Sequence, residues 1–228
     1  MKNYATSEHT KNLLINAAGE LAAELGFSNV STRAISERSG ENIGSIHYHF
    51  GGKDALFEDV VKTAIADIKE TPSWSVINEI HSNATSPQIL SETIQKIVHQ
   101  QIRTLFDQAK PRWHSQVIYQ LLQFEGELND IFKREILKPD IDAMRKFFRI
   151  IKPKMPDDEI LLRSLILQMP IFAHANYMPA ILKLLDTPSY SDEYLMMMEN
   201  LLVHQTQLLL GLPLTGALKP DAKKKIKR

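Results

Sequence analysis

The chain has 228 residues, of which 43% are hydrophobic and 24% charged, and this ordinary globular mixture excludes disordered, collagen-like and mucin-like proteins. Cysteine is absent and the longest apolar run is five residues, Tyr194 to Met198, which excludes disulfides, thiolate metal sites and a membrane-spanning helix of about 20 residues. The formal net charge is zero, but residues 219–228 carry six basic groups, so bulk charge elsewhere does not indicate a nucleic-acid binder.

A helical period, with apolar residues three or four positions apart, recurs in nearly every segment, and no segment alternates as a strand would. The first predicted helix runs from a Thr10 cap to Gly26. Two short helices follow, over 33–39 and from Asn42 to His49, and a longer one runs from Asp54 to Thr71. The Ser-, Asn- and Pro-rich segment 72–86 is expected to be a connection.

Six more helices are predicted beyond this connection, with boundaries set by caps and prolines. They cover about 87–106, 113–124, 127–137, 139–151, 157–176 and 191–210. Pro170 lies inside one of them and removes a hydrogen bond to Ile166, which favours a bend there. The sequence therefore predicts an all-α fold.

The domains predicted from this pattern are an N-terminal three-helix helix-turn-helix domain and a larger helical domain. The first covers residues 1–70 with the helix-turn-helix at about 31–50, and the second covers 71–213. Residues 214–228 form a basic tail, expected to be disordered, and the alternative is a mobile arm that adds DNA affinity. The start of the chain lacks the apolar segment of a secretory signal, so a cytoplasmic protein with no membrane contact is expected.

The most informative stretch runs from Ser31 to Lys53, where two short helices meet at Gly40 and Glu41. Ile35, Ile46 and Phe50 are predicted to pack inward. The second helix keeps hydroxyl, imidazole and phenol groups for its outer face, a set suited to base edges in a major groove and to phosphates at its rim.

At these positions the sequence resembles the TetR family of bacterial transcriptional regulators. The residues that carry the resemblance are Thr10, Leu14, Ala17, Ala18, Gly26, Phe27, Thr32, Ile35, Gly40, Gly44, Ile46, Tyr48, His49, Phe50, Lys53 and Leu56. Two positions depart from the family pattern: Glu41 stands where a small apolar residue is usual, and His47 where tyrosine is usual. Residues 42–53 and 134–139 are further similar to the CecR-like subgroup.

The resemblance implies a homodimer that places the helix at 43–49 of each subunit into successive major grooves of double-stranded DNA. The operator is then near-palindromic, with half-sites roughly 34–36 Å apart or a multiple of it. Thr32 is expected at a phosphate, and Arg33, Asn42 and Ser45 at base edges. His47, Tyr48, His49 and Lys53 are expected at phosphates or groove walls. The full predicted DNA-binding set is Thr32, Arg33, Asn42, Ile43, Ser45, His47, Tyr48, His49 and Lys53.

The resemblance also implies that the larger domain senses a small-molecule effector and forms the dimer through helices 157–176 and 191–210. Expected interface positions are Ile160, Leu161, Arg163, Leu167, Leu195, Met198, Leu202, Gln205 and Leu209. Large side chains that could line the effector pocket are Trp113, His114, Tyr119, Phe124, Met144, Phe148, Met169, Phe172, His174 and Tyr177.

The leading hypothesis is a repressor released from its operator by the effector, with an activator as the nearest variant. The alternative from another class is an all-helical small-molecule carrier or enzyme whose helix-turn-helix domain is vestigial. No nucleophile–base pair indicates catalysis, and no cofactor is expected. His47 and His49 are two residues apart on a helix and point in nearly opposite directions, so no metal site is expected there.

Overall fold

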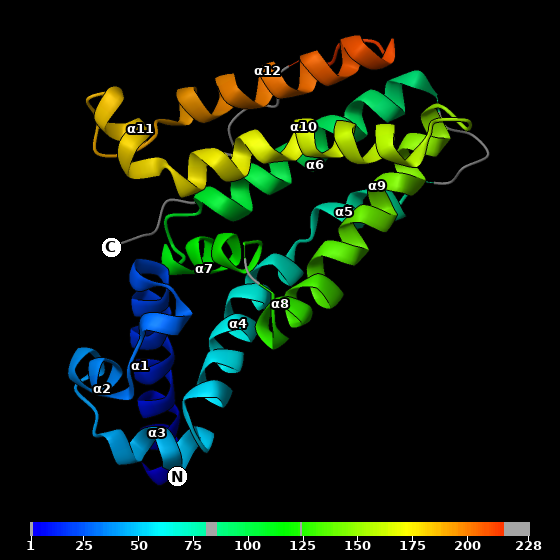
Figure 1. Cartoon of the computed structure of the whole chain (residues 1–228). Helices are drawn as coiled ribbons and strands as arrows, with labels where there is room; N and C mark the ends of the chain where they lie inside the picture. The colour runs from blue at the N-terminus through cyan, green and yellow to red at the C-terminus, as the bar shows by residue number, and fades with distance from the viewer. Residues whose placement is uncertain (1, 81–85, 124, 217–228) are drawn as a thin grey trace. The chain divides into compact units, whose positions relative to one another are not determined.

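A computed structural model describes residues 2–80, 86–123 and 125–216, and within these ranges the chain is helical with no strand, as the sequence predicts (Figure 1). The chain divides into two compact units. Unit 1 comprises Met1–Glu70 and Asp107–Pro139, and unit 2 comprises Thr71–Phe106 and Asp140–Arg228. Residues 107–139 therefore pack with the N-terminal unit, although they lie inside the range 71–213 that was predicted as one functional domain.

Unit 1 is built around two long helices, α1 and α4. Its elements are α1 (Lys2–Leu25), η1 (Phe27–Asn29), α2 (Thr32–Ser39), α3 (Ile43–Phe50), α4 (Lys53–Glu70), α7 (Trp113–Leu121), α8 (Glu127–Phe132) and the π-helical turn η2 (Lys133–Leu137). The apolar stripe of α1, carried by Leu14, Ala18 and Leu21, is buried. Helix α7 contacts both α1 and α4.

Trp113 joins α7 to α1 at a position where only glycine fits. A Cβ atom built on Gly19 would lie 2.5 Å from ring carbons of Trp113. The Trp113 ring is 4% exposed, and its Nε1–H donates to Asn16 Oδ1 at 3.2 Å. The missing side chain at Gly19 therefore creates the space for the indole ring.

Unit 2 is a second group of helices with its own buried core. Its elements are α5 (Ser73–Asn78), α6 (Pro87–Phe106), α9 (Lys138–Ile151), α10 (Asp157–Asn176), α11 (Met178–Leu184) and α12 (Asp192–Leu210). Both α10 and α12 run alongside α6, as Figure 1 shows. The largest fully buried side chains here include Ile97, Phe147 and Phe148.

Two of the predictions made for these helices were wrong. Helix α1 begins at Lys2, so Thr10 is not a cap. The supposed connection 72–86 contains α5, whose Ile77 is fully buried in unit 2 despite the polar composition around it. The range predicted for α10, 157–176, was confirmed; Pro170 lies inside this helix, and a bend of 80° lies at the junction of α10 with α11.

The predicted dimer-interface positions divide into two groups. Ile160, Leu167, Met198 and Leu202 are buried within unit 2 itself, so they serve its own core. A neighbouring apolar row on the same two helices is exposed: Leu161, Leu162, Leu165, Ile166 and Met169 on α10, and Met197, Leu201, Leu208 and Leu209 on α12. Of the predicted positions, Leu161 and Leu209 belong to this exposed row, and Gln205 is exposed as well.

The apolar helices do not individually reach membrane-spanning character. Within residues 2–80, 86–123 and 125–216, no single helix is long and apolar enough to cross a membrane. The pair α10 and α11 meets the length and composition only when taken together across its bend. Most of the predicted tail, residues 217–228, lies outside the described residues.

Candidate nucleic-acid interface

The two short helices of the helix-turn-helix are delimited by side-chain caps and left-handed glycines. Ser31 Oγ accepts from Ala34 N at 3.1 Å at the start of α2, and Asn42 Oδ1 accepts from Ser45 N at 2.9 Å at the start of α3. Gly40 and Gly51 end the helices with φ of 75° and 80°, a conformation that glycine adopts without strain. Local sequence thus fixes the length of each helix.

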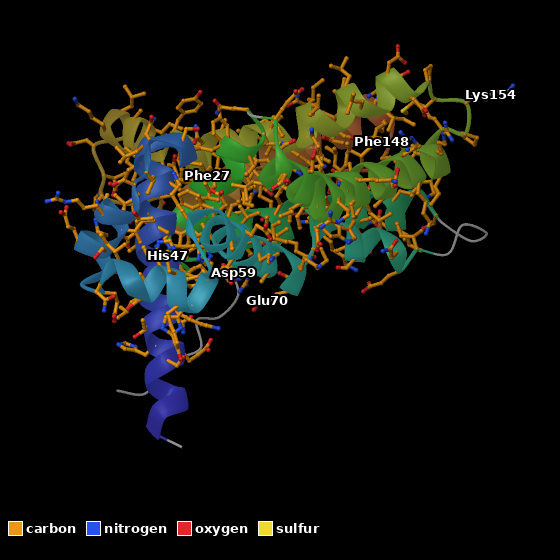
Figure 2. The ribbon with its side chains drawn as sticks, turned by 60° about the horizontal axis from the view of Figure 1, so that its bottom comes forward. Phe27, His47, Asp59, Glu70, Phe148 and Lys154 are labelled. Carbon is orange, nitrogen blue, oxygen red and sulfur yellow. The ribbon has the colours of Figure 1, made fainter. Side chains whose placement is uncertain are left out.

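Buried isoleucines hold α2 and α3 against α1. Ile35 and Ile46 are fully buried, as predicted, whereas Phe50 is only half-buried. Anchoring at Ile46 leaves the opposite face of α3 to solvent. Tyr48 lies on that face and is 84% exposed, and elsewhere on the helix Ile43 is 42% exposed and His47, labelled in Figure 2, is exposed as well.

The predicted base-edge residues differ in how free their side chains are. Arg33 is exposed but pairs with Glu37 at 2.9 Å, and this carboxylate raises the pKa of the guanidinium. Asn42 uses its carbonyl oxygen as the α3 cap, so its Nδ2 group is the part available to a base. Ser45 and Thr32 are half-buried, with Thr32 at the first position of α2.

The predicted phosphate residues at the end of α3 are oriented by aromatic and backbone contacts. His49 is half-buried between Tyr48 and Phe50, with ring centroids 4.9 and 6.3 Å away. Lys53 Nζ donates to Val30 O at 3.1 Å and lies 5.7 Å from the Phe57 ring centroid. One donor of the ammonium therefore secures the unit, and two remain for a phosphate.

The acidic residues near this surface are held by neighbouring side chains. Glu41 accepts a hydrogen bond from Thr10 Oγ1 at 3.2 Å, and its backbone carbonyl accepts one from Ser36. Arg38 bridges to Glu20 at 3.2 Å and Glu24 at 2.9 Å, which ties α2 to α1 and lowers the pKa of Glu24. These contacts restrict the rotation of the carboxylates of Glu41, Glu20 and Glu24.

The predicted effector-pocket residues fall in both units. In unit 1, Trp113 packs over Gly19 and His114 Nδ1 pairs with Asp67 of α4. In unit 2, Met144 and Phe148 are core residues, while Met169 and Tyr177 are 39% and 55% exposed. The remaining members are half-buried or undescribed: Tyr119, Phe172 and His174 are half-buried, and Phe124 lies outside the described residues.

Sequence analysis missed a set of polar side chains inside unit 2. Gln101, Gln168 and Glu199 are 7%, 7% and 6% exposed, and burial raises the pKa of the half-buried Asp140 carboxyl. Each lies in the apolar stripe of its helix, as Gln101 does after Ile94 and Ile97. A polar residue at a stripe position is the signal that could have revealed them.

The described ranges contain no group of three or more His, Asp or Glu side chains that could hold a metal ion. The candidate site of this chain is therefore characterised by hydrogen-bonding side chains on an exposed short helix. Its geometry is that of a helix able to enter a groove, with its rim contacts on α2 and at the start of α4.

Comparisons with known proteins agree with this geometry. Residues 14–60 match the family described as bacterial regulatory proteins, tetR family. The protein named "Probable HTH-type transcriptional regulator YttP" of Bacillus subtilis (strain 168) is 32% identical over 81 residues, which is 36% of this chain and 39% of the relative. The chain thus spans about two fifths of the length of the curated relative that it matches.

Solved structures share the fold over most of the chain. A bacterial regulatory protein in the tetR family from Rhodococcus RHA1 has a TM-score of 0.61 at 14% identity and covers 90% of this chain and 98% of its own. The fatty acid degradation regulator FadR from Bacillus halodurans has a TM-score of 0.55 at 18% identity, with 88% and 97% covered. The chain therefore carries a tetR-family helix-turn-helix domain, matched over residues 14–60, within a TetR-like helical fold.

Proposed function

We propose that the chain is a DNA-binding transcriptional regulator in which α3 reads the major groove of an operator. The observation that carries the proposal is the pairing of a fully buried Ile46 with an exposed His47 and Tyr48 on a capped, eight-residue helix. The buried face fixes the helix, and the exposed face offers donors and an aromatic ring to base edges and phosphates. The proposal includes membership in the CecR-like subgroup, which residues 42–53 resemble.

The proposed active form is a two-fold symmetric homodimer. The exposed apolar rows of α10 and α12 supply a self-complementary surface, since residues such as Leu162 and Leu201 are 59% and 65% exposed within the described chain. Asp158 and Glu159 border a shallow hollow on α10 that is otherwise lined by leucines. Two copies then present two α3 helices to half-sites roughly 34–36 Å apart, or a multiple of it, on a near-palindromic operator.

In the proposed cycle the free dimer holds its operator as a repressor and releases it when a small molecule binds within unit 2. Effector and operator affinities are then reciprocally coupled, each reducing the other by the same factor. Residues 1–55 carry five basic and six acidic groups, so few phosphates are neutralised and the salt dependence of binding is modest.

The test is selection of genomic DNA fragments by the purified chain, followed by binding to the best fragment. A near-palindrome that is retained by the wild type and lost by Tyr48→Ala, with an unchanged circular dichroism spectrum, supports the proposal. Leu162→Glu combined with Leu201→Glu is expected to give a monomer by light scattering and to reduce operator affinity. Recovery of no sequence preference by the wild type at low salt contradicts the proposal and favours the carrier or enzyme alternative.

A further inference from the structure

A directed chain of hydrogen bonds crosses the interior of unit 2. Ser73 Oγ donates to Asp140 Oδ1 at 3.1 Å, and Gln168 Nε2 donates to Asp140 Oδ2 at 3.0 Å. Gln101 Nε2 in turn donates to Gln168 Oε1 at 3.3 Å. The four residues come from α5, α9, α10 and α6, so the chain of bonds links four helices of one unit.

The direction of this chain follows from the chemistry of Asp140. A carboxylate only accepts, so Gln168 must turn its amide nitrogen toward Asp140 and its oxygen toward Gln101. Gln101 must then donate from Nε2 to Gln168, so its own Oε1 points away from this series of hydrogen bonds. Gln101 Oε1 is buried and has no hydrogen-bond partner. A buried acceptor left unpaired costs free energy. A ligand that donated a hydrogen bond to Gln101 Oε1 would remove this cost.

The charges buried in unit 2 are carboxylates, and Asp140 is the one joined to Gln101, through Gln168. Glu199 is buried beside His99, its Oε2 lying 2.9 Å from Nδ1, while its Oε1 has no partner. No lysine or arginine is among the buried polar residues of the described chain. An anionic ligand at Gln101 would therefore lack a buried cation to pair with, whereas a hydrogen-bond donor would satisfy the unpaired Gln101 Oε1.

We infer that Gln101, oriented by Gln168 and Asp140, is the recognition element for an apolar small molecule that carries a hydrogen-bond donor, such as an amine, a hydroxyl or an amide. This inference rests on the proposed function and gives its effector a chemical class. Ile97 and Ile171 lie within about one turn of Gln101 and Gln168 on the same helices, Met144 lies one turn after Asp140 on α9, and all three belong to the core. Met144, being flexible, is the side chain able to yield space for the apolar body.

Ser73, Gln101 and Asp140 lie close in sequence to the points where the polypeptide enters or leaves unit 2. Asp140 is the first residue of the second stretch of unit 2, and Ser73 is the third residue of the first stretch. Gln101 lies five residues before Phe106, where the chain leaves unit 2. A ligand that draws Gln101 toward itself therefore acts on the segments by which the chain enters and leaves this unit.

The experiment compares three probes that share one ring: benzylamine, benzyl alcohol and benzoate. Thermal unfolding of the full chain is followed with each probe up to about 20 mM. Benzylamine and benzyl alcohol are expected to raise the Tm saturably, by about 3–6 °C at ten times their Kd, and benzoate is expected to raise it less. Gln101→Met is expected to weaken both donor probes about tenfold.

Two further variants keep the result interpretable. Gln95→Met is the matched control, because Gln95 is a buried glutamine on the same helix that donates to Gly216 O at 2.6 Å, outside the polar chain; it should bind the probes as the wild type does. If Gln101→Met does not fold, Asp140→Asn serves instead, since it retains an acceptor for Gln168 and removes the charge. Asp140→Asn should bind benzyl alcohol as the wild type does and bind benzylamine about tenfold more weakly than the wild type does.

Three results overturn the inference: benzoate binding as tightly as the donor probes, unchanged binding by a folded Gln101→Met, or no saturable Tm rise with any probe. Retention of the selected operator fragment is measured on the same wild-type sample. Operator binding that persists while the probes fail overturns the inference alone, whereas loss of sequence-specific DNA binding overturns the proposed function.

Discussion

Gly19→Ala provides a sharp test of packing in unit 1, because two physical effects predict opposite signs. In an exposed helix interior, replacing glycine by alanine stabilises by about 1 kcal/mol through helix propensity. At Gly19 the new Cβ would lie 2.5 Å from ring carbons of Trp113. Since the ring is 4% exposed and bonded to Asn16, it cannot move aside without losing burial and a hydrogen bond.

The expected net effect is destabilisation by about 1–3 kcal/mol, the usual cost of overpacking a filled core. Urea unfolding followed by circular dichroism measures it, with the slope m as the check on two-state behaviour. The matched control is the same substitution in a Trp113→Leu background, where the ring is gone and Gly19→Ala should be neutral or stabilising. Stabilisation in the wild-type background would refute the packing argument.

Four further predictions address the helix-turn-helix and the proposed dimer. Asn42→Ala should cost about 0.5–2 kcal/mol of unfolding free energy by loss of the α3 cap. Asn42→Asp should retain the cap and weaken operator binding. Equal effects of the two substitutions on stability would argue against the cap. Tyr48→Ala should change stability by less than about 0.5 kcal/mol, because the side chain is 84% exposed, while reducing operator affinity at least about tenfold in a gel-shift titration. Arg38 lowers the pKa of Glu24 from its ordinary value of 4.5, so their pair stabilises the fold above that pH and is lost as the pH falls through the lowered value. The urea midpoint of the wild type should therefore exceed that of Arg38→Gln at pH 7 and approach it at pH 3. A difference between the two midpoints that stays constant with pH would contradict this sign. Leu208→Glu should weaken dimerisation without lowering monomer stability, because the side chain is 66% exposed, and an unchanged sedimentation coefficient at low concentration would place the dimer surface elsewhere.

The sequence was sufficient wherever a local signal determines structure. The acidic residues and Pro156 predict the start of α10, and its observed bounds are Asp157–Asn176. The inward isoleucines of α2 and α3 were likewise confirmed, and side-chain caps at Ser31 and Asn42 begin these two helices. These features depend on neighbours within a few residues, so they can be read from the chain directly.

Features set by distant contacts were not predictable in the same way. Trp113 and His114 were assigned to a pocket, but they pack on Gly19 and Asp67, residues about 94 and 47 positions earlier in the chain. The choice between Leu167 and its exposed neighbour Ile166 depends on which helix covers the face, and the helical period alone does not decide it. The DNA-contact and pocket assignments remain predictions, because they concern partners outside the chain.

The central claim is that α3 reads DNA sequence, and salt-titrated binding tests it most directly. The wild type and the variant Asn42→Ser with Ser45→Ala, which loses two predicted base-edge side chains and keeps a capping hydroxyl on α3, are titrated against the selected fragment and against a scrambled fragment of equal length. The account predicts a preference of at least about a thousandfold for the selected fragment in the wild type, and its loss in the folded double variant with residual sequence-independent affinity unchanged. Equal affinity of the wild type for both fragments across the salt range would contradict it.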